Sequence, residues 1–275
     1  MVINELNIKD KKDIIILFTI KGDKIVDSFL DSYLKKKDKS KIFIVDINEN
    51  DASKIETKIK IQNFLKQSSQ INISILGHGS VTPLNINNNK IEAPAVVYEI
   101  SSVNVKTYSP LTLSQMISDY IPSASFEKNK KSSKISIKLL CCNTGVRCVL
   151  SKDAKSAVEI SDEDYFKNKN YYDDNINFRK PFAESFLEEL NQYYSNIENH
   201  NPVIIDVKAP IGNLRISQYS DKMRYDIVAL SALYDPACAV KGKPNDEAIA
   251  EKYQSKLLNR DSDGQKIIST FNIYS

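Results

Sequence analysis

The segment Ile71-Asn-Ile-Ser-Ile-Leu-Gly-His-Gly79 joins an apolar run of strand length to a histidine between two glycines. A second run, Ile135-Ser-Ile-Lys-Leu-Leu140, leads directly into Cys141 and Cys142. Three more apolar runs of similar length occupy residues 13–20, 41–46 and 203–207. Short runs of this kind, rich in β-branched residues, are typical of strands buried on both faces of a parallel sheet.

Segments with helical spacing separate these runs. Apolar residues recur every three or four positions in the segments 25–34, 55–65, 111–120 and 182–194. Alternation of strands and helices predicts an α/β fold with a mostly parallel central sheet flanked by helices and joined by right-handed crossovers.

Three segments depart from this alternation. Residues 90–108 contain two β-rich pieces around Ser101-Ser102, which predict a hairpin inserted after the His78 strand. Beyond Pro210 the segments 213–218 and 223–229 predict a β-hairpin flap, followed by a polar helix over 246–258 and a last strand over 267–274. The charged, tyrosine-rich segment of about 146–180 lacks periodicity and is interpreted as a long surface insertion.

Length and composition fit one domain that spans residues 1–275. The chain is 41% apolar, which is enough for a sizeable core, and we place that core at about 12–208 and the flap with its C-terminal elements at about 209–275. Its 38 Lys and Arg against 35 Asp and Glu give a formal charge of +3, which argues against a dedicated nucleic-acid-binding domain.

The sequence also bears on cellular location. No apolar run is long enough to span a membrane, and the first residues lack the features of a cleaved signal peptide. Four cysteines are too few for a disulfide scaffold in a chain of this length, so a reducing compartment is expected. Export by a route without a cleaved signal stays open.

The ends of two predicted strands carry residues that can do chemistry. Ligands and substrates of open parallel sheets bind at the carboxyl ends of the strands, which is where His78 and Cys142 fall. A cysteine becomes a useful nucleophile when an imidazole or a positive field favours its thiolate. The pattern therefore predicts a Cys–His site, with the backbone N–H groups of Gly79 and Cys142 as candidate oxyanion donors.

Less specific interpretations compete with this one. Cysteines in strands are commonly small core residues, and a Gly-His-Gly turn alone is weak evidence. Cys148 and Cys238 are interpreted as packing residues, and His200 as a cap or surface residue in a polar loop. A zinc site is disfavoured because the chain has no CxxC pair and only two histidines.

The order of His before Cys resembles the caspase-like (clan CD) cysteine peptidases. The closer resemblance is to the autoprocessing cysteine protease domain of large clostridial glucosylating toxins and RTX toxins. Ile75-Leu-Gly-His-Gly79 looks like the histidine motif of that domain, and Ile137-Lys-Leu-Leu-Cys-Cys-Asn143 looks like its nucleophile motif. This alignment makes Cys142 the nucleophile and puts Cys141 where the family has a glycine.

The resemblance implies further residues and a cofactor. Lys21-Gly-Asp-Lys-Ile25 is similar to the segment that supplies the acidic member of the site, so Asp23 would orient His78, although an acidic residue at a helix start is also favourable by itself. The family is activated by inositol hexakisphosphate, for which the matching basic residues are Lys36, Arg215, Lys222 and Arg224. Solvated surface charge is the competing interpretation of these residues. No metal is implied.

The resemblance implies a cysteine endopeptidase with a His78–Cys142 dyad, secreted or translocated by a bacterium and acting in a host cytosol. We expect a monomer that cleaves a protein or peptide substrate, or its own chain, often after leucine. Three departures stand out: Cys141, the absence of tryptophan from the flap, and the charged insertion. The alternatives are a non-catalytic polyphosphate-sensing or protein-binding module of the same fold, or another Cys-dependent acyl transferase.

Overall fold

A computed structural model describes most of the predicted core. The residues it describes are 14–23, 26–27, 30, 34, 42–48, 51–65, 70–86, 89–101, 104–122, 133–195, 203–210, 212–219, 222–229 and 268–274. The predicted helix at 246–258, Lys36, His200 and Cys238 lie outside these residues.

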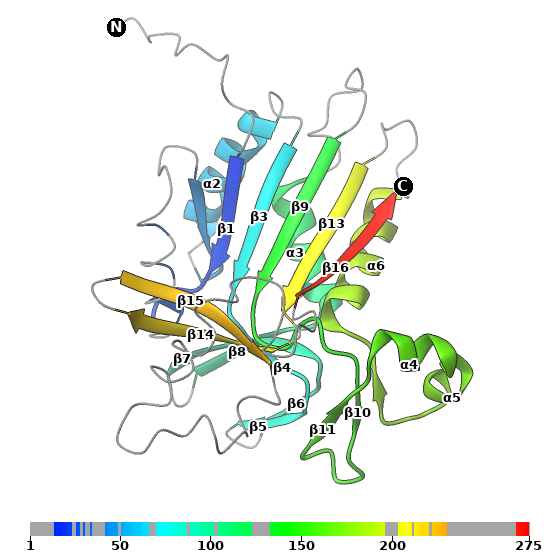
Figure 1. The fold of residues 1–275 in the computed structure, drawn as a ribbon. Helices are drawn as coiled ribbons and strands as arrows, with labels where there is room; N and C mark the ends of the chain where they lie inside the picture. Colours follow the sequence, from blue (N-terminus) through cyan, green and yellow to red (C-terminus); the bar gives the residue numbers. More distant parts are fainter. Residues whose placement is uncertain are drawn as a thin grey trace, which may run out of the picture.

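Six strands form the central sheet (Figure 1), in the order β2-β1-β3-β9-β13-β16. The first five are parallel: β1 (Ile14–Thr19), β2 (Ile42–Asp46), β3 (Gln70–Leu76), β9 (Ser133–Leu140) and β13 (Val203–Pro210). All five apolar runs of the sequence are therefore strands, and the predicted α/β fold with a mostly parallel sheet is confirmed.

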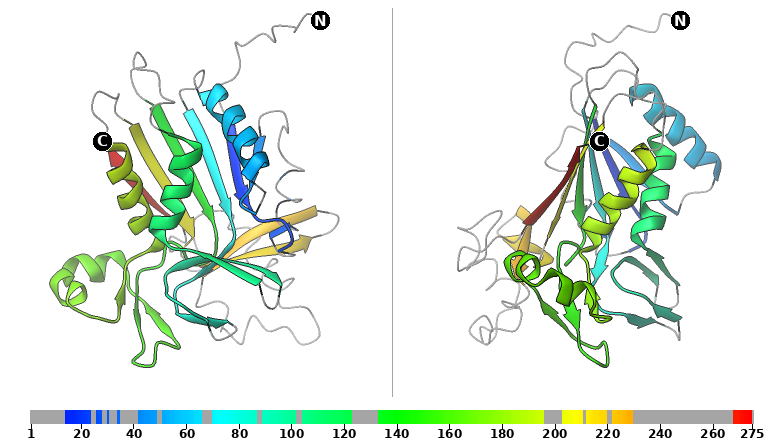
Figure 2. Two further views of the ribbon diagram at one scale, coloured as in Figure 1. Left: turned by 180° about the vertical axis from the view of Figure 1, so that it is seen from behind. Right: turned by 90° about the vertical axis from the view of Figure 1, so that its right-hand side faces the viewer.

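Three of the helices in the described part of the chain pack against the sheet. They are α2 (Asp51–Leu65), α3 (Pro110–Tyr120) and α6 (Phe182–Ser195), and Figure 2 shows all three on the same face. Ser109 caps α3 by accepting a hydrogen bond from the Thr112 amide, and Pro110 follows at the first helical position, where its missing N–H costs nothing.

The main core lies between these helices and the sheet. Alternate residues of each strand point toward the helices, which gives every parallel strand an apolar row. Those rows meet apolar residues of α3 and α6, and the buried set includes Ile71, Ile73, Ile75, Ile135, Ile137, Leu139, Ile205, Val207, Leu113, Ile117, Phe186 and Leu190.

Accessory elements gather at the carboxyl ends of the parallel strands (Figure 1). The predicted hairpin is confirmed: β7 (Ala95–Ser101) pairs with β8 (Asn104–Tyr108), and β7 also pairs with β4 (His78–Ser80). A small hairpin of β5 (Leu84–Ile86) and β6 (Asn89–Ile91) lies between β4 and β7 in the chain. The predicted flap is also a hairpin, formed by β14 (Gly212–Tyr219) and β15 (Lys222–Ala229).

The insertion is more regular than its sequence suggests. Its strands β10 (Cys148–Leu150), β11 (Ala157–Glu159) and β12 (Phe178–Arg179) form a three-stranded sheet, and two short helices, α4 (Asp162–Lys167) and α5 (Lys169–Asp173), precede β12. Elements of two to six residues are too short to produce a recognisable period, so the sequence could not reveal them.

Two further expectations needed correction. The last strand, β16 (Ile268–Tyr274), was expected outside the core at 12–208 but runs antiparallel to β13 at the edge of the central sheet. β9 is not buried on both faces, because Lys134 and Lys138 are exposed and alternate with buried isoleucines. By contrast β1 is fully buried at Ile16, Leu17 and Phe18, as its uninterrupted apolar run predicts.

Candidate active site

The predicted site residues follow three neighbouring strands of the central sheet. Asp23 follows β1, His78 follows β3 and Cys142 follows β9. In the sheet order β2-β1-β3-β9, the connection after β1 leads toward one edge and the connection after β3 leads toward the other, so a switch point lies between β1 and β3. Ligands of open α/β sheets bind at the carboxyl ends of the strands beside such a switch point, where Asp23 follows β1 and His78 follows β3.

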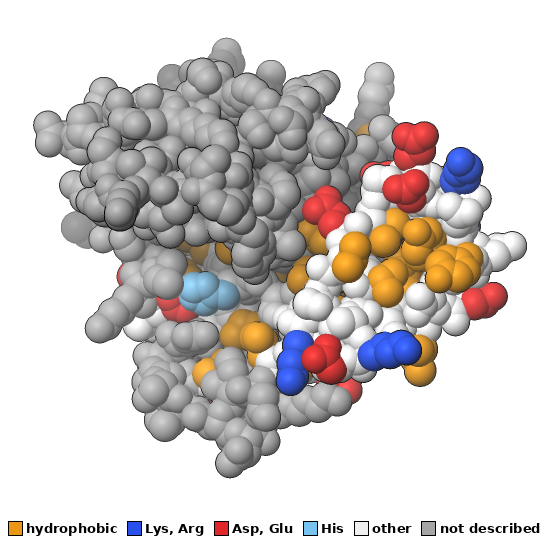
Figure 3. All heavy atoms as spheres, turned by 60° about the horizontal axis from the view of Figure 1, so that its bottom comes forward, with side chains coloured by type: hydrophobic (Ala, Val, Ile, Leu, Met, Phe, Trp, Pro, Cys, Tyr) orange, Lys and Arg blue, Asp and Glu red, His pale blue; other side chains and the backbone are white. Residues whose placement is uncertain are grey.

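Asp23 contacts His78 directly. Its Oδ2 lies 2.9 Å from Nε2 of the imidazole, although the two residues are 55 positions apart in the sequence. The Asp23 side chain is only 3% exposed whereas that of His78 is 30% exposed. Figure 3 looks onto this end of the molecule and shows a histidine side chain at its surface. The carboxylate is therefore held behind a ring that solvent or a substrate can reach.

Gly79 allows the His78 and Cys142 segments to approach one another, and Gly77 allows β7 to pack beside His78. A Cβ at Gly79 would lie 1.7 Å from the carbonyl oxygen of Cys142 and 3.1 Å from its amide nitrogen. A Cβ at Gly77 would lie 2.9 Å from Val96 and 3.0 Å from the Tyr98 ring. Only glycine at position 79 fits this packing, so the residue after His78 lies directly against the backbone of Cys142.

The turn after Cys142 is fixed by several hydrogen bonds. Thr144 donates its hydroxyl to the Cys141 carbonyl at 3.0 Å, and the Val146 amide donates to the Asn143 carbonyl at 3.1 Å. Asn143 has a φ of 55°, a left-handed conformation that asparagine tolerates better than most residues. These bonds shape the loop of residues 141–147, which carries the predicted nucleophile and is called the nucleophile loop below.

The two adjacent cysteines have different environments. Cys141 is fully buried, and its thiol donates to the Ile75 carbonyl at 3.5 Å. Burial, and secondarily the neighbouring Cys142 thiol, raises the pKa of Cys141 well above its ordinary value, which keeps it a neutral thiol. Cys142 is partly exposed. The side chains alternate as they would along a strand, so only Cys142 turns away from the core.

The candidate oxyanion donors also lie together. The backbones of Gly79 and Cys142 are in contact, as the position of a Cβ at Gly79 demonstrates. Because the two segments come from β4 and from the end of β9, this contact depends on the pairing of β3 with β9, in which Leu76 lies opposite Leu140.

Tyr98 was not identified from the sequence. It lies on β7, is fully buried, and its ring packs against Gly77, next to His78. Its hydroxyl has no hydrogen-bond partner among the described residues. Burial, with smaller contributions from Cys141, Tyr108 and Asp23, raises the pKa of Tyr98 well above its ordinary value. The β7 segment reads as an ordinary apolar strand, so nothing in the sequence marked this tyrosine.

The structure says little about the four basic residues expected to bind phosphate. Lys36 is outside the described residues, and for Arg215, Lys222 and Arg224 the structure gives the backbone of the flap but not the side chains. Other lysines do lie close together on the central sheet: Lys138 and Lys208 are exposed and opposite one another on β9 and β13. Lys134, on the same row of β9, pairs with Asp206 at 3.1 Å.

A metal-binding cluster and a membrane-spanning helix are both absent from the described part of the chain. No group of three or more His, Cys, Asp or Glu side chains there is arranged to hold a metal ion. None of the described helices is long and apolar enough to cross a bilayer. The described cysteines, Cys141, Cys142 and Cys148, form no disulfide, and Cys148 is buried as predicted.

Comparison with known proteins gives little more. No protein-family profile matches the sequence, and no curated protein matches it. A solved structure described as pro-sf-caspase-1 is similar at a TM-score of 0.29 and 12% sequence identity, over 95% of this chain and 90% of that one. A likeness this distant assigns neither a family nor an activity.

Proposed function

We propose that this chain is a cysteine endopeptidase in which Cys142 is the nucleophile, His78 its proton-transfer partner and Asp23 the residue that orients the imidazole. The observation that carries the proposal is the convergence of the three residues. Asp23 contacts His78 at 2.9 Å, and the residue after His78 lies against the backbone of Cys142. These contacts support a catalytic triad with Cys142 as nucleophile, His78 as base and Asp23 as orienting acid.

The contact with Asp23 assigns the two imidazole nitrogens. In the neutral ring, the nitrogen that carries the proton donates to the carboxylate, so Nε2–H would face Asp23. Nδ1 is then the nitrogen that would accept the thiol proton of Cys142. Asp23 would also stabilise the imidazolium that forms, as the acid does in other triads.

The reaction would follow the course of other thiol peptidases. Transfer of the Cys142 proton to His78 gives a thiolate, which attacks the scissile carbonyl carbon while the N–H groups of Gly79 and Cys142 stabilise the oxyanion. The C–N bond then breaks, His78 protonates the leaving amine, and an acyl-enzyme thioester remains. Water, activated by His78, hydrolyses the thioester and restores the thiol.

The environments of the adjacent thiols favour Cys142 over Cys141 in this role. Cys141 is buried with a raised pKa, and both features oppose formation of an accessible thiolate. Cys142 is partly exposed at the end of the same strand. Cys141 stands where the family that the sequence resembles has a glycine. Its side chain is buried in the core, away from Cys142, so a cysteine can replace the glycine without blocking the proposed nucleophile.

The wider role proposed for the chain is that of a bacterial toxin or secreted effector activated by inositol hexakisphosphate. The support is the motif resemblance together with the flap hairpin, which lies near the carboxyl ends of the strands (Figure 1). Arg215, Lys222 and Arg224 of the flap and Lys36 are the proposed ligands, and the adjacent Lys138 and Lys208 add positive charge on the sheet.

Peptide hydrolysis tests both proposals together. Extended peptides with leucine on the acyl side of the cut should be hydrolysed by the wild-type chain, and Cys142→Ala and His78→Ala should each lower kcat/KM by about 10³-fold or more. Cys141→Ala is the matched control and should retain activity. Addition of inositol hexakisphosphate should raise both the rate and the melting temperature.

The possible failures are distinguishable. Ligand-induced stabilisation without hydrolysis would favour a non-catalytic polyphosphate-sensing module. Hydrolysis that is independent of inositol hexakisphosphate, with no change in melting temperature at saturation, would contradict its proposed role as activator but not the proposed peptidase activity. Equal rates for wild type and Cys142→Ala would contradict the peptidase proposal itself.

A further inference from the structure

Arg147 is a buried charged residue that the proposed reaction does not use. It ends the nucleophile loop, five residues after Cys142, and its side chain is only 4% exposed. A guanidinium is costly to bury unless acidic partners compensate its charge. Arg147 lies where the insertion begins and close in sequence to the proposed nucleophile, so its buried contacts can affect the position of that residue.

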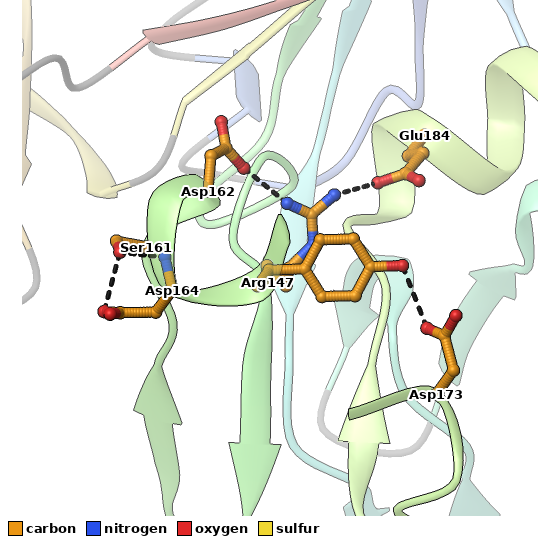
Figure 4. A network of polar contacts seen from close by, with 7 residues as sticks. Arg147, Ser161, Asp162, Asp164, Asp173 and Glu184 are labelled. Carbon is orange, nitrogen blue, oxygen red and sulfur yellow. Dashed lines mark hydrogen bonds and ion pairs between the residues drawn. The ribbon is translucent and has the colours of Figure 1, made fainter. Parts of the chain in front are cut away.

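Two carboxylates from different parts of the fold compensate the charge (Figure 4). Nη1 pairs with Asp162, the first residue of α4 in the insertion, and Nη2 pairs with Glu184 in the first turn of α6, a helix of the core. Each acid also lies at a helix N-terminus, where a negative charge is favourable. One guanidinium thus joins the insertion to the helix layer of the core.

Aromatic packing strengthens the attachment on the insertion side. The Arg147 guanidinium carbon lies 4.1 Å from the centroid of the Tyr165 ring, a cation–π distance. Tyr165 stacks on Phe178 of β12 at 5.3 Å and donates its hydroxyl to Asp173 at 2.9 Å. Arg147 therefore packs against the aromatic centre of the insertion and not against a single mobile side chain.

Backbone hydrogen bonds hold the rest of the nucleophile loop to the same elements. The Ala183 amide of α6 donates to the Thr144 carbonyl at 2.9 Å, and the Gly145 amide donates to the Pro210 carbonyl at 2.8 Å. The Ile160 amide of the insertion donates to the carbonyl of Arg147 at 2.8 Å. The loop that follows Cys142 is thus attached to α6, β13 and the insertion.

We infer that Arg147 is a positioning residue: by joining α4 to α6 it fixes the far end of the nucleophile loop and so keeps the Cys142 thiol next to His78. The inference rests on the proposed function, to which it adds a role for the insertion. The insertion would then be an integral support of the active site, and its loosening would lower the reactivity of Cys142 without any change in the residues that touch substrate.

The test compares the reactivity of Cys142 in wild type and Arg147→Met, which keeps an apolar stem but removes the guanidinium. The rate of Cys142 alkylation by iodoacetamide is measured as a function of pH. In the variant, the midpoint of this pH profile should shift toward about 8.5, the pKa of an unperturbed cysteine. The kcat for peptide hydrolysis should fall about tenfold or more with a smaller change in KM, because a misplaced nucleophile mainly affects the chemical step. Arg147→Lys should recover only part of the loss, since an ammonium lacks the planar fork that reaches both acids.

Lys180→Met is the matched control. It removes an exposed ion pair of 3.1 Å between Lys180 and Glu188 of α6, neither of which belongs to the nucleophile loop, so its alkylation profile should match wild type. A folded Arg147→Met with the wild-type profile and kcat would overturn the inference. If Arg147→Met does not fold, the Asp162→Asn/Glu184→Gln variant decides, and an unchanged profile there overturns it. A wild-type midpoint already at the free-cysteine value would instead refute the proposed function, and the inference with it.

Discussion

Asp23 uses its two carboxylate oxygens for two purposes. Oδ2 contacts the His78 imidazole at 2.9 Å, while Oδ1 accepts a hydrogen bond from the Val26 amide at 3.1 Å. The Asp23 carbonyl also accepts from the Asp27 amide at 2.8 Å, as expected at the start of a helix. The two interpretations of this residue, helix cap and orienting acid, are therefore compatible, and the cap fixes the carboxylate that faces the histidine.

Asp23→Asn separates these purposes. Asparagine caps helices about as well as aspartate, so the melting temperature should change little. An amide neither carries the charge nor enforces the same imidazole tautomer, and kcat should fall by about 10²-fold or more. Peptide hydrolysis and thermal unfolding of the same preparation check both expectations. An unchanged kcat in Asp23→Asn would show that Asp23 is only a cap.

At the scale of elements, the sequence predicted the strands and helices that have a clear apolar pattern. The five parallel strands, α2, α3, α6 and both hairpins were recognisable because each has its own apolar pattern. Strand ends then indicated His78 and Cys142, since the carboxyl ends of parallel strands meet at one edge of a sheet. Asp23 was indicated only by the resemblance of residues 21–25 to the family's acidic segment. The contact between Gly79 and Cys142 was not predictable, because it depends on the register of β3 against β9.

The insertion itself was predicted, but its strands and helices were not, because they depend on contacts that are distant in sequence. β10 is three residues long and pairs with β12, almost thirty positions later. In the sequence Arg147 cannot be distinguished from a surface arginine, because its partners Asp162 and Glu184 are distant in the chain. The helix α2 shows the opposite failure: Ile55 and Ile59 fit its apolar pattern but are more than half exposed, so periodicity alone overstated its buried face.

At the scale of the whole molecule, burial of ionisable groups predicts how stability depends on pH. Burial raises the pKa of Cys148 to about 11 and raises that of Cys141 well above its ordinary value. The pKa of Tyr194, whose hydroxyl donates to the Ile121 carbonyl at 2.7 Å, is raised as well. The unfolded chain therefore loses these protons at lower pH than the folded chain does, and alkali favours unfolding.

For Cys148 the expected result is a loss of unfolding free energy that begins near pH 8.5 and continues to about pH 11, by up to about 1.4 kcal/mol per pH unit. Urea unfolding at pH 7.5 and 10 under reducing conditions measures it. Cys148→Ala should show a weaker pH dependence than wild type, even if it is less stable at pH 7.5. The same dependence in both proteins would contradict the burial argument.

The central claim concerns which atom reacts, and covalent labelling tests it most directly. A leucine acyloxymethyl ketone should modify the wild-type chain at one site, and peptide mass spectrometry should locate the label on Cys142. Labelling should persist in Cys141→Ala, disappear in Cys142→Ala and become much slower in His78→Ala. A label on Cys141, or labelling that survives Cys142→Ala, would contradict the account.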